Sequence, residues 1–251
     1  MNRPQETSMG GPCARFPSTC WSLIRAAADP KSGESGSALN RLCHLYWKPV
    51  YAFIRTHNTL RNEDPKDLTQ GFLIEVLSGT MLQRYRPERG AFRSYLLGAV
   101  QLYLSEQRNR AAALKRGGGR AILRLDEDET RRMEEWLADW KESPETAYEL
   151  AWAHSVLENA IAALEDELRQ SGKEQWFQAY RRYEIEVEPD DSPTYQALAV
   201  ELGVTVRDVG NYLTSCKKRL RELVRDAVQD TVDDPAEILP ELHRILRLIK
   251  G

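Results

Sequence analysis

The sequence predicts an all-α protein built from two small helical domains. Apolar residues recur at three- and four-residue spacing through most of the chain, which is the period of an amphipathic helix, and no stretch of any length has the alternation of a strand. Between the two helical regions, residues 126–149 hold ten acidic and three basic residues. A length of 251 residues suits one large domain or two small ones. We therefore expect two helical domains joined by an acidic linker.

The first domain is expected at 19–118, after an N-terminus of 1–18 that is rich in Gly, Pro and small polar residues and predicts disorder. Pro49 should bend or restart the second helix, because proline removes a helical hydrogen bond. Asp64 can cap the third helix. Four helices are expected in this order: a short one containing Trp21 and Ile24, then about 38–56, one opening at Pro65, and about 92–115.

The acidic linker is expected at 119–144, with at most a short helix of its own. The second domain is expected at 145–228, and it begins with helices at about 148–168 and 173–183. Asp-Asp-Pro at 233–235 precedes a short amphipathic stretch, so 229–251 is predicted to be a C-terminal helical tail.

Residues 195–220 read as two helices joined by a tight turn at Leu202-Gly203-Val204. Gly203 stands where a positive φ angle is needed, and Thr205 with Asp208 has the spacing of a capping box for the second helix. Apolar residues at helical spacing can share one small core: Leu198, Ala199, Leu202, Val204, Val209, Tyr212 and Leu213. This is the helix-turn-helix pattern, whose second helix lies in a DNA major groove.

The outward face of that second helix carries polar groups suited to DNA. Arg207, Asn211, Thr214 and Ser215 have donors and acceptors of the kind that read base edges. A basic cluster suited to phosphate contacts follows: Lys217, Lys218, Arg219 and Arg221. The alternative is an ordinary helical hairpin with a solvated basic face.

The sequence lacks the residue patterns of enzymes and of metal or cofactor sites. The glycines at 117–119 are not a phosphate-binding loop, and His44, His57, His154 and His243 lack metal-ligand spacing, so neither an enzyme nor a cofactor or metal site is expected. The four scattered cysteines contain no CxxC pair and favour reduced thiols in the cytoplasm. No apolar run reaches the roughly 20 residues of a membrane span.

Three segments in this order resemble a bacterial RNA polymerase sigma factor of the minimal, extracytoplasmic-function type, which keeps only regions two and four. DLTQGFLIEVL at 67–77 resembles the region-two helix that docks on the polymerase clamp. RGAFRSYLLGAVQLYLSEQRNRAAALKR at 89–116 resembles the following promoter-melting segment, and residues 191–223 resemble region four, which reads the −35 element. The resemblance covers about 19–118 and 145–228.

The resemblance implies a transcription initiation factor whose partners are core RNA polymerase and promoter DNA, with an anti-sigma protein as a further partner. Polymerase binding would involve Asp67, Gln70 and Glu75. Contacts to the −10 element would involve Arg93, Tyr95, Gln101, Arg108, Asn109, Arg110, Lys115 and Arg116. Contacts to the −35 element would involve Thr205, Arg207, Asn211, Thr214, Ser215, Lys217, Lys218 and Arg219.

A stand-alone helix-turn-helix regulator, with 1–118 as an interaction domain, is the rival interpretation. Departures from the family pattern at Gly71, Tyr95 and Gly210 keep it open. A third interpretation is an adaptor that binds polymerase without recognising a promoter. The acidic linker has two interpretations as well, a mimic of nucleic acid inside the polymerase or a solvated tether.

Overall fold

The computed structural model describes residues 8–9, 20–57, 64–77, 80–113, 124–186 and 193–229. These residues are helical apart from turns and one pair of two-residue strands, which confirms the all-α prediction. The chain forms two compact units, and two of the boundaries fall within helices, between Val156 and Leu157 and between Ala227 and Val228. The sequence had instead predicted a linker at 119–144 as the division.

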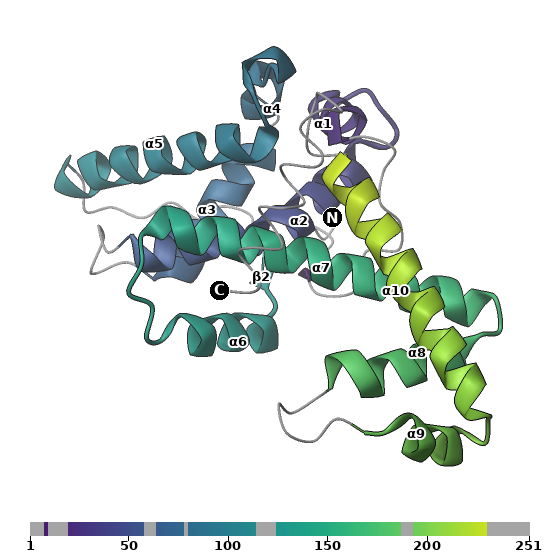
Figure 1. Cartoon of the computed structure of the whole chain (residues 1–251). Coiled ribbons are helices and arrows are strands. Elements are labelled where there is room, and N and C mark those ends of the chain that lie inside the picture. Colours follow the sequence, from purple (N-terminus) through teal and green to yellow (C-terminus); the bar gives the residue numbers. More distant parts are fainter. Residues whose placement is uncertain are drawn as a thin grey trace, which may run out of the picture. The chain divides into compact units, whose positions relative to one another are not determined.

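The first unit is a cluster of helices with one short parallel ladder. Strand β1 (Ser8–Met9) pairs with β2 (Arg124–Leu125). The helices are α1 (Cys20–Ala28), α2 (Ser35–Thr56), α3 (Pro65–Leu77), α4 (Thr80–Arg84), the 3₁₀ turn η1 (Pro87–Arg89), α5 (Phe92–Ala113), α6 (Glu127–Leu137) and the first part of α7 (Pro144–Gln170) (Figure 1).

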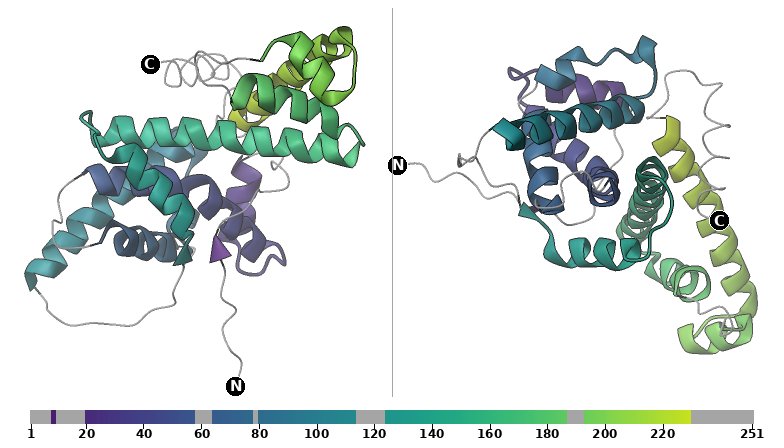
Figure 2. Two further views of the ribbon diagram at one scale, coloured as in Figure 1. Left: turned by 90° about the horizontal axis from the view of Figure 1, so that it is seen from below. Right: turned by 90° about the vertical axis from the view of Figure 1, so that its left-hand side faces the viewer.

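Helix α2 is the centre of this unit. Val50, Tyr51, Ala52 and Phe53 are consecutive and all fully buried, so apolar side chains leave α2 in every direction around its axis. Helices α1, α3, α5 and α6 pack around it (Figures 1 and 2). Helix α2 continues through the buried Pro49 rather than restarting there, because packing on all sides offsets the hydrogen bond that proline removes.

Part of the predicted linker is a packed helix rather than a tether. Thr130, Met133 and Leu137 recur at three- and four-residue spacing in α6 and are buried. Glu134 accepts hydrogen bonds from the Tyr51 hydroxyl and from Arg55 Nε, the latter at 2.9 Å. The acidic character of α6 therefore serves in part to attach it to α2.

The second unit is built from the rest of α7, α8 (Glu174–Tyr180), the π-helical turn η2 (Arg181–Ile185), α9 (Tyr195–Leu202) and α10 (Val206–Gln229) as far as Ala227. Its core joins residues from each of the four helices: Ala160, Leu164, Phe177, Tyr180, Leu198, Ala199, Val209, Leu213, Cys216 and Leu223. This core fixes α9 and α10 on a base made by α7 and α8.

Several predicted features lie outside the described residues. They are the N-terminal stretch 1–18 apart from 8–9, the linker residues 119–123, and the tail 230–251. None of the helices in the described ranges combines the length and the apolarity that crossing a bilayer requires.

Candidate nucleic-acid interface

The turn between α9 and α10 has the geometry that the sequence predicted. Thr194 caps α9 by accepting a hydrogen bond from the Ala197 N–H at 3.1 Å. Gly203 ends α9 in the left-handed region, at φ 67°, and the Val204 N–H donates to the Ala199 carbonyl at 3.0 Å. Glycine takes this backbone conformation without steric cost, so only three residues separate the end of α9 from the start of α10.

The first turn of α10 is fixed by a reciprocal capping box. The Asp208 N–H donates to Thr205 Oγ1 at 3.2 Å, and the Thr205 N–H donates to Asp208 Oδ2 at 3.1 Å. The Thr205 hydroxyl also donates to that carboxylate at 2.6 Å, and these bonds from Thr205 lower the pKa of Asp208. The predicted cap is confirmed, and the Thr205 hydroxyl proton is committed to it.

Helices α9 and α10 are joined by a continuous apolar face. Leu198 and Ala199 of α9 and Val209 and Leu213 of α10 are buried in the core of the second unit. Tyr212 stacks on Trp176 with ring centroids 5.1 Å apart. This packing leaves the opposite side of α10 to solvent.

That opposite side carries a single polar stripe, which we call the α10 stripe. Its members are exposed and spaced by four, three, four and three residues, so they fall within roughly 80° around the helix axis. They are Arg207, Asn211, Thr214, Lys218 and Arg221. The exposed Ser215 lies beside the stripe, and Thr214 Oγ1 donates to the Gly210 carbonyl at 2.8 Å. Four of the residues predicted to contact DNA are thus brought together on one face.

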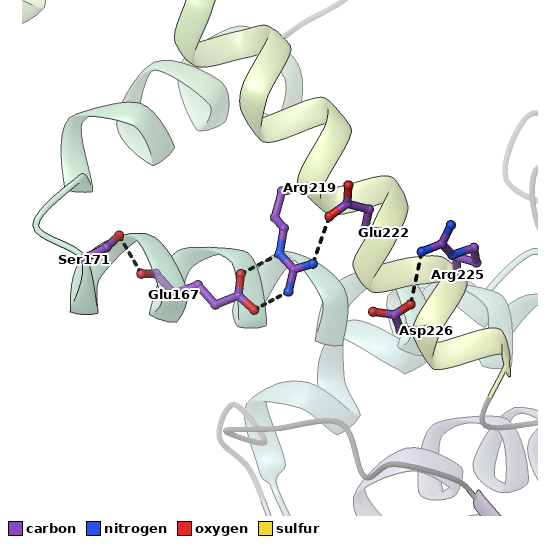
Figure 3. A network of polar contacts seen from close by, with 6 residues as sticks. All are labelled: Glu167, Ser171, Arg219, Glu222, Arg225 and Asp226. Atoms are coloured by element: carbon purple, nitrogen blue, oxygen red, sulfur yellow. Dashed lines mark hydrogen bonds and ion pairs between the residues drawn. The ribbon is translucent and has the colours of Figure 1, made fainter.

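Two other predicted DNA contacts are held in ion pairs within the second unit. Arg219 binds Glu167 through Nε at 2.8 Å and Nη2 at 2.7 Å, and binds Glu222 through Nη1 at 3.0 Å (Figure 3). Lys217 Nζ lies 2.8 Å from Glu184 of η2. The sequence analysis did not foresee these partners, because Glu167 lies 52 residues before Arg219 and only the fold brings them together.

Arg93 is not on the surface, in contrast to the sequence prediction. Its side chain is buried, with Nε 3.4 Å from Glu149 Oε2 and the guanidinium 4.7 Å from the Trp152 ring centroid. The Tyr148 hydroxyl donates to the Arg93 carbonyl at 3.0 Å. Phe92 and Leu96 turn this end of α5 into the core, so Arg93 pairs with α7 and is not available to a phosphate.

The other α5 candidates divide into packed and exposed residues. The Tyr95 ring lies 5.4 Å from that of Tyr85, its hydroxyl donates to the Met81 carbonyl at 2.8 Å, and burial raises its pKa. Gln101, Arg108 and Asn109 are exposed, and Gln101 Nε2 donates to Glu145 at 3.3 Å. The side chain of Arg110 and all of Lys115 and Arg116 lie outside the described residues.

The α3 candidates lie on a helix whose other side is buried by Leu68, Phe72, Leu73 and Val76. Asp67 and Glu75 are exposed and Gln70 is half-buried. Gly71 faces α5, because a Cβ atom at this position would overlap the Tyr103 hydroxyl. The glycine is therefore explained by a close approach of two helices.

The described residues contain no group of three or more His, Cys, Asp or Glu side chains arranged to hold a metal ion. Comparisons with protein families, with curated proteins and with solved structures found no match for this chain.

Proposed function

We propose that this protein is a sigma factor that binds core RNA polymerase and directs it to a subset of promoters. The observation that carries the proposal is the α10 stripe, an exposed row of base-reading and phosphate-binding side chains on the second helix of a capped helix-turn-helix. The order of the segments that resemble region two and region four adds the link to polymerase. The site of action would be the cytoplasm.

In this proposal the α10 stripe reads the −35 element as duplex DNA. Arg207 suits guanine, whose O6 and N7 accept two hydrogen bonds from a guanidinium, and Asn211 suits adenine in the same way. Ser215 is a further base-edge candidate. Lys218 and Arg221, further along the helix, suit phosphates and would supply salt-sensitive affinity.

The exposed part of α5 would contact the −10 element. Amide and guanidinium groups suit splayed-out bases and phosphates, and Gln101, Arg108 and Asn109 provide them on the described surface. Arg93 has no part in this role, because it is buried against α7.

Helix α3 would dock on the polymerase through Asp67, Gln70 and Glu75. These polar side chains stand on a helix whose apolar face is firmly packed, which gives a rigid base for hydrogen bonds to a partner. Rigid placement limits the conformational entropy lost on binding.

Co-purification with bacterial core RNA polymerase tests the proposal. We expect stoichiometric binding by the wild type and its loss in the double variant Asp67→Ala/Gln70→Ala. A matched control is Gln178→Ala/Gln196→Ala, which removes two exposed amides from α8 and α9 and should bind like the wild type. A wild-type chain that ignores polymerase yet binds duplex DNA alone would instead be a helix-turn-helix regulator.

A further inference from the structure

Ion pairs on both sides of the exposed stripe hold the recognition helix α10 in place. Arg219 and Lys217 lie one residue either side of Lys218, and so point about 100° away from it in opposite directions around the helix axis. Arg219 reaches Glu167 of α7, and Lys217 reaches Glu184 of η2. Each ion pair joins α10 to an element that comes earlier in the second unit.

The Arg219 contact is the stronger of these two ion pairs. Its guanidinium makes two parallel hydrogen bonds to Glu167, at 2.7 and 2.8 Å, and a third to Glu222 at 3.0 Å (Figure 3). Bidentate pairing of this kind fixes orientation as well as distance. Glu167 is itself on a well-formed end of α7, where Ser171 Oγ donates to its carbonyl at 2.9 Å.

The same contacts make Arg219 unsuitable as a phosphate ligand. Two carboxylates surround one guanidinium, so the local charge is negative and a phosphate that approached it would be repelled. Freeing Arg219 would also leave Glu167 and Glu222 without their shared partner. Lys218, by contrast, is exposed, and none of the described carboxylates is paired with it.

We infer that Arg219, assisted by Lys217, is a positioning residue that sets the orientation of α10, while Lys218 and Arg221 bind the phosphates. Glu167 is then part of the DNA-reading unit although it carries the charge that DNA repels. This inference rests on the proposed promoter recognition. It separates the basic residues 217–221, which look alike in the sequence, into positioning residues and phosphate-binding residues.

The decisive variant is Glu167→Gln, because the two roles predict opposite signs. If Arg219 were a phosphate ligand restrained by Glu167, removing that negative charge would tighten DNA binding and steepen its salt dependence. If Arg219 positions α10, Glu167→Gln should weaken binding about as much as Arg219→Gln does, by about threefold because both side chains are partly exposed, and the double variant should lose no more.

The experiment measures promoter binding by holoenzyme reconstituted from the full chain and core RNA polymerase, on a duplex selected from a random library by the wild type. We expect Arg219→Gln to leave the slope of log K against log salt unchanged, and Lys218→Gln to reduce it by about 0.9. Glu165→Gln, which removes another carboxylate from α7 that pairs only with Arg169 among the contacts described, should behave like the wild type. Tighter binding by Glu167→Gln, or a slope lowered by Arg219→Gln, would overturn the inference.

A second measurement separates this inference from the proposed function. The free energies of unfolding of Glu167→Gln, Arg219→Gln and the double variant form a cycle that needs no DNA. Coupling in this cycle together with absent promoter binding would retain the positioning role of Arg219 and Glu167 and refute the sigma-factor proposal. Additive effects would refute the positioning role whatever the protein binds.

Discussion

The missing side chain at Gly71 allows α3 and α5 to approach closely. Tyr103 of α5 is buried, its ring lies 5.5 Å from that of Phe72, and its hydroxyl fills the space that a Cβ atom of residue 71 would need. A tyrosine ring fixed in this way cannot easily move aside.

Gly71→Ala should therefore destabilise the protein. The overlap costs about 1–3 kcal/mol, which outweighs the gain of about 1 kcal/mol in helix propensity. Gly98→Ala in α5 is the matched control, because its Cβ meets no atom within 4 Å and only the gain in propensity remains. Chemical denaturation measures both, and in a Tyr103→Phe background the penalty at position 71 should disappear. Equal effects at 71 and 98 would refute this packing argument.

Arg93 should matter for stability and not for nucleic-acid binding. Arg93→Met removes the ion pair between the buried guanidinium and Glu149, whose side chain is 13% exposed, and breaking a largely buried pair costs about 3–5 kcal/mol. Arg108→Met, on the exposed part of the same helix, should change the free energy of unfolding by less than about 0.5 kcal/mol. Thermal and urea unfolding would show the contrast, and an unaffected Arg93→Met protein would contradict it.

For single residues, the capping and turn roles were predictable from the sequence, whereas burial was less predictable. The Thr205–Asp208 cap and the positive φ of Gly203 follow from residue type and spacing alone, and both were confirmed. The burial of Arg93 depends on Glu149, 56 positions later in the chain, so sequence spacing on α5 could not reveal it.

Among the elements, the turn between α9 and α10 depends most on one backbone conformation. Gly203→Ala forces a side chain into the left-handed region and should destabilise the second unit by about 1–2 kcal/mol. Gly210→Ala should do the reverse, because Gly210 is helical and its Cβ would meet only Tyr195 Cε2, at an ordinary 3.8 Å. Hydrogen exchange of the α9 and α10 amides measures the difference, and a harmless Gly203→Ala would contradict the assigned turn.

The attachment of α10 to α7 should depend on pH. Hydrogen bonds from Arg219 hold the pKa of Glu167 below its ordinary value and raise the pKa of Arg219. The stability from this pair is therefore fully present above the ordinary glutamate pKa of about 4.3, and is lost as the pH falls through the lower folded-state value. The stability difference between the wild type and Glu167→Gln should be constant from about pH 7 to pH 5 and vanish in stronger acid. A difference that does not shrink as the pH falls below this range would contradict this linkage.

The helices themselves were largely predictable, since their apolar residues keep the helical period. Helix α6 is the exception. Its many acidic residues indicated a tether, but burial of Thr130, Met133 and Leu137 packs one face of it. Lys48 and Arg55 of α2 form ion pairs with two of its carboxylates. Net charge in a segment thus says little about whether one face of it is packed.

For the whole molecule, the boundary between the compact units that follows Val156 falls within α7. The sequence could not place it, because the apolar period continues without a break across Val156 and Leu157. The candidate site was predictable where it consists of one exposed face of α10, because helical spacing alone places those residues together. The division of its basic residues into exposed and ion-paired groups required the positions of Glu167 and Glu184.

The proposed sigma-factor function is tested by transcription reconstituted from purified core RNA polymerase, the full chain and a library of promoter variants. We expect initiation only when the chain is present, from a defined subset of promoters. We also expect Arg207→Ala to lose discrimination worth about 1–3 kcal/mol at one base pair of the −35 element. If core polymerase with this chain initiates no better than core alone, the sigma-factor proposal is contradicted. If Arg207→Ala keeps the wild-type preference, the proposed recognition of the −35 element by Arg207 is contradicted.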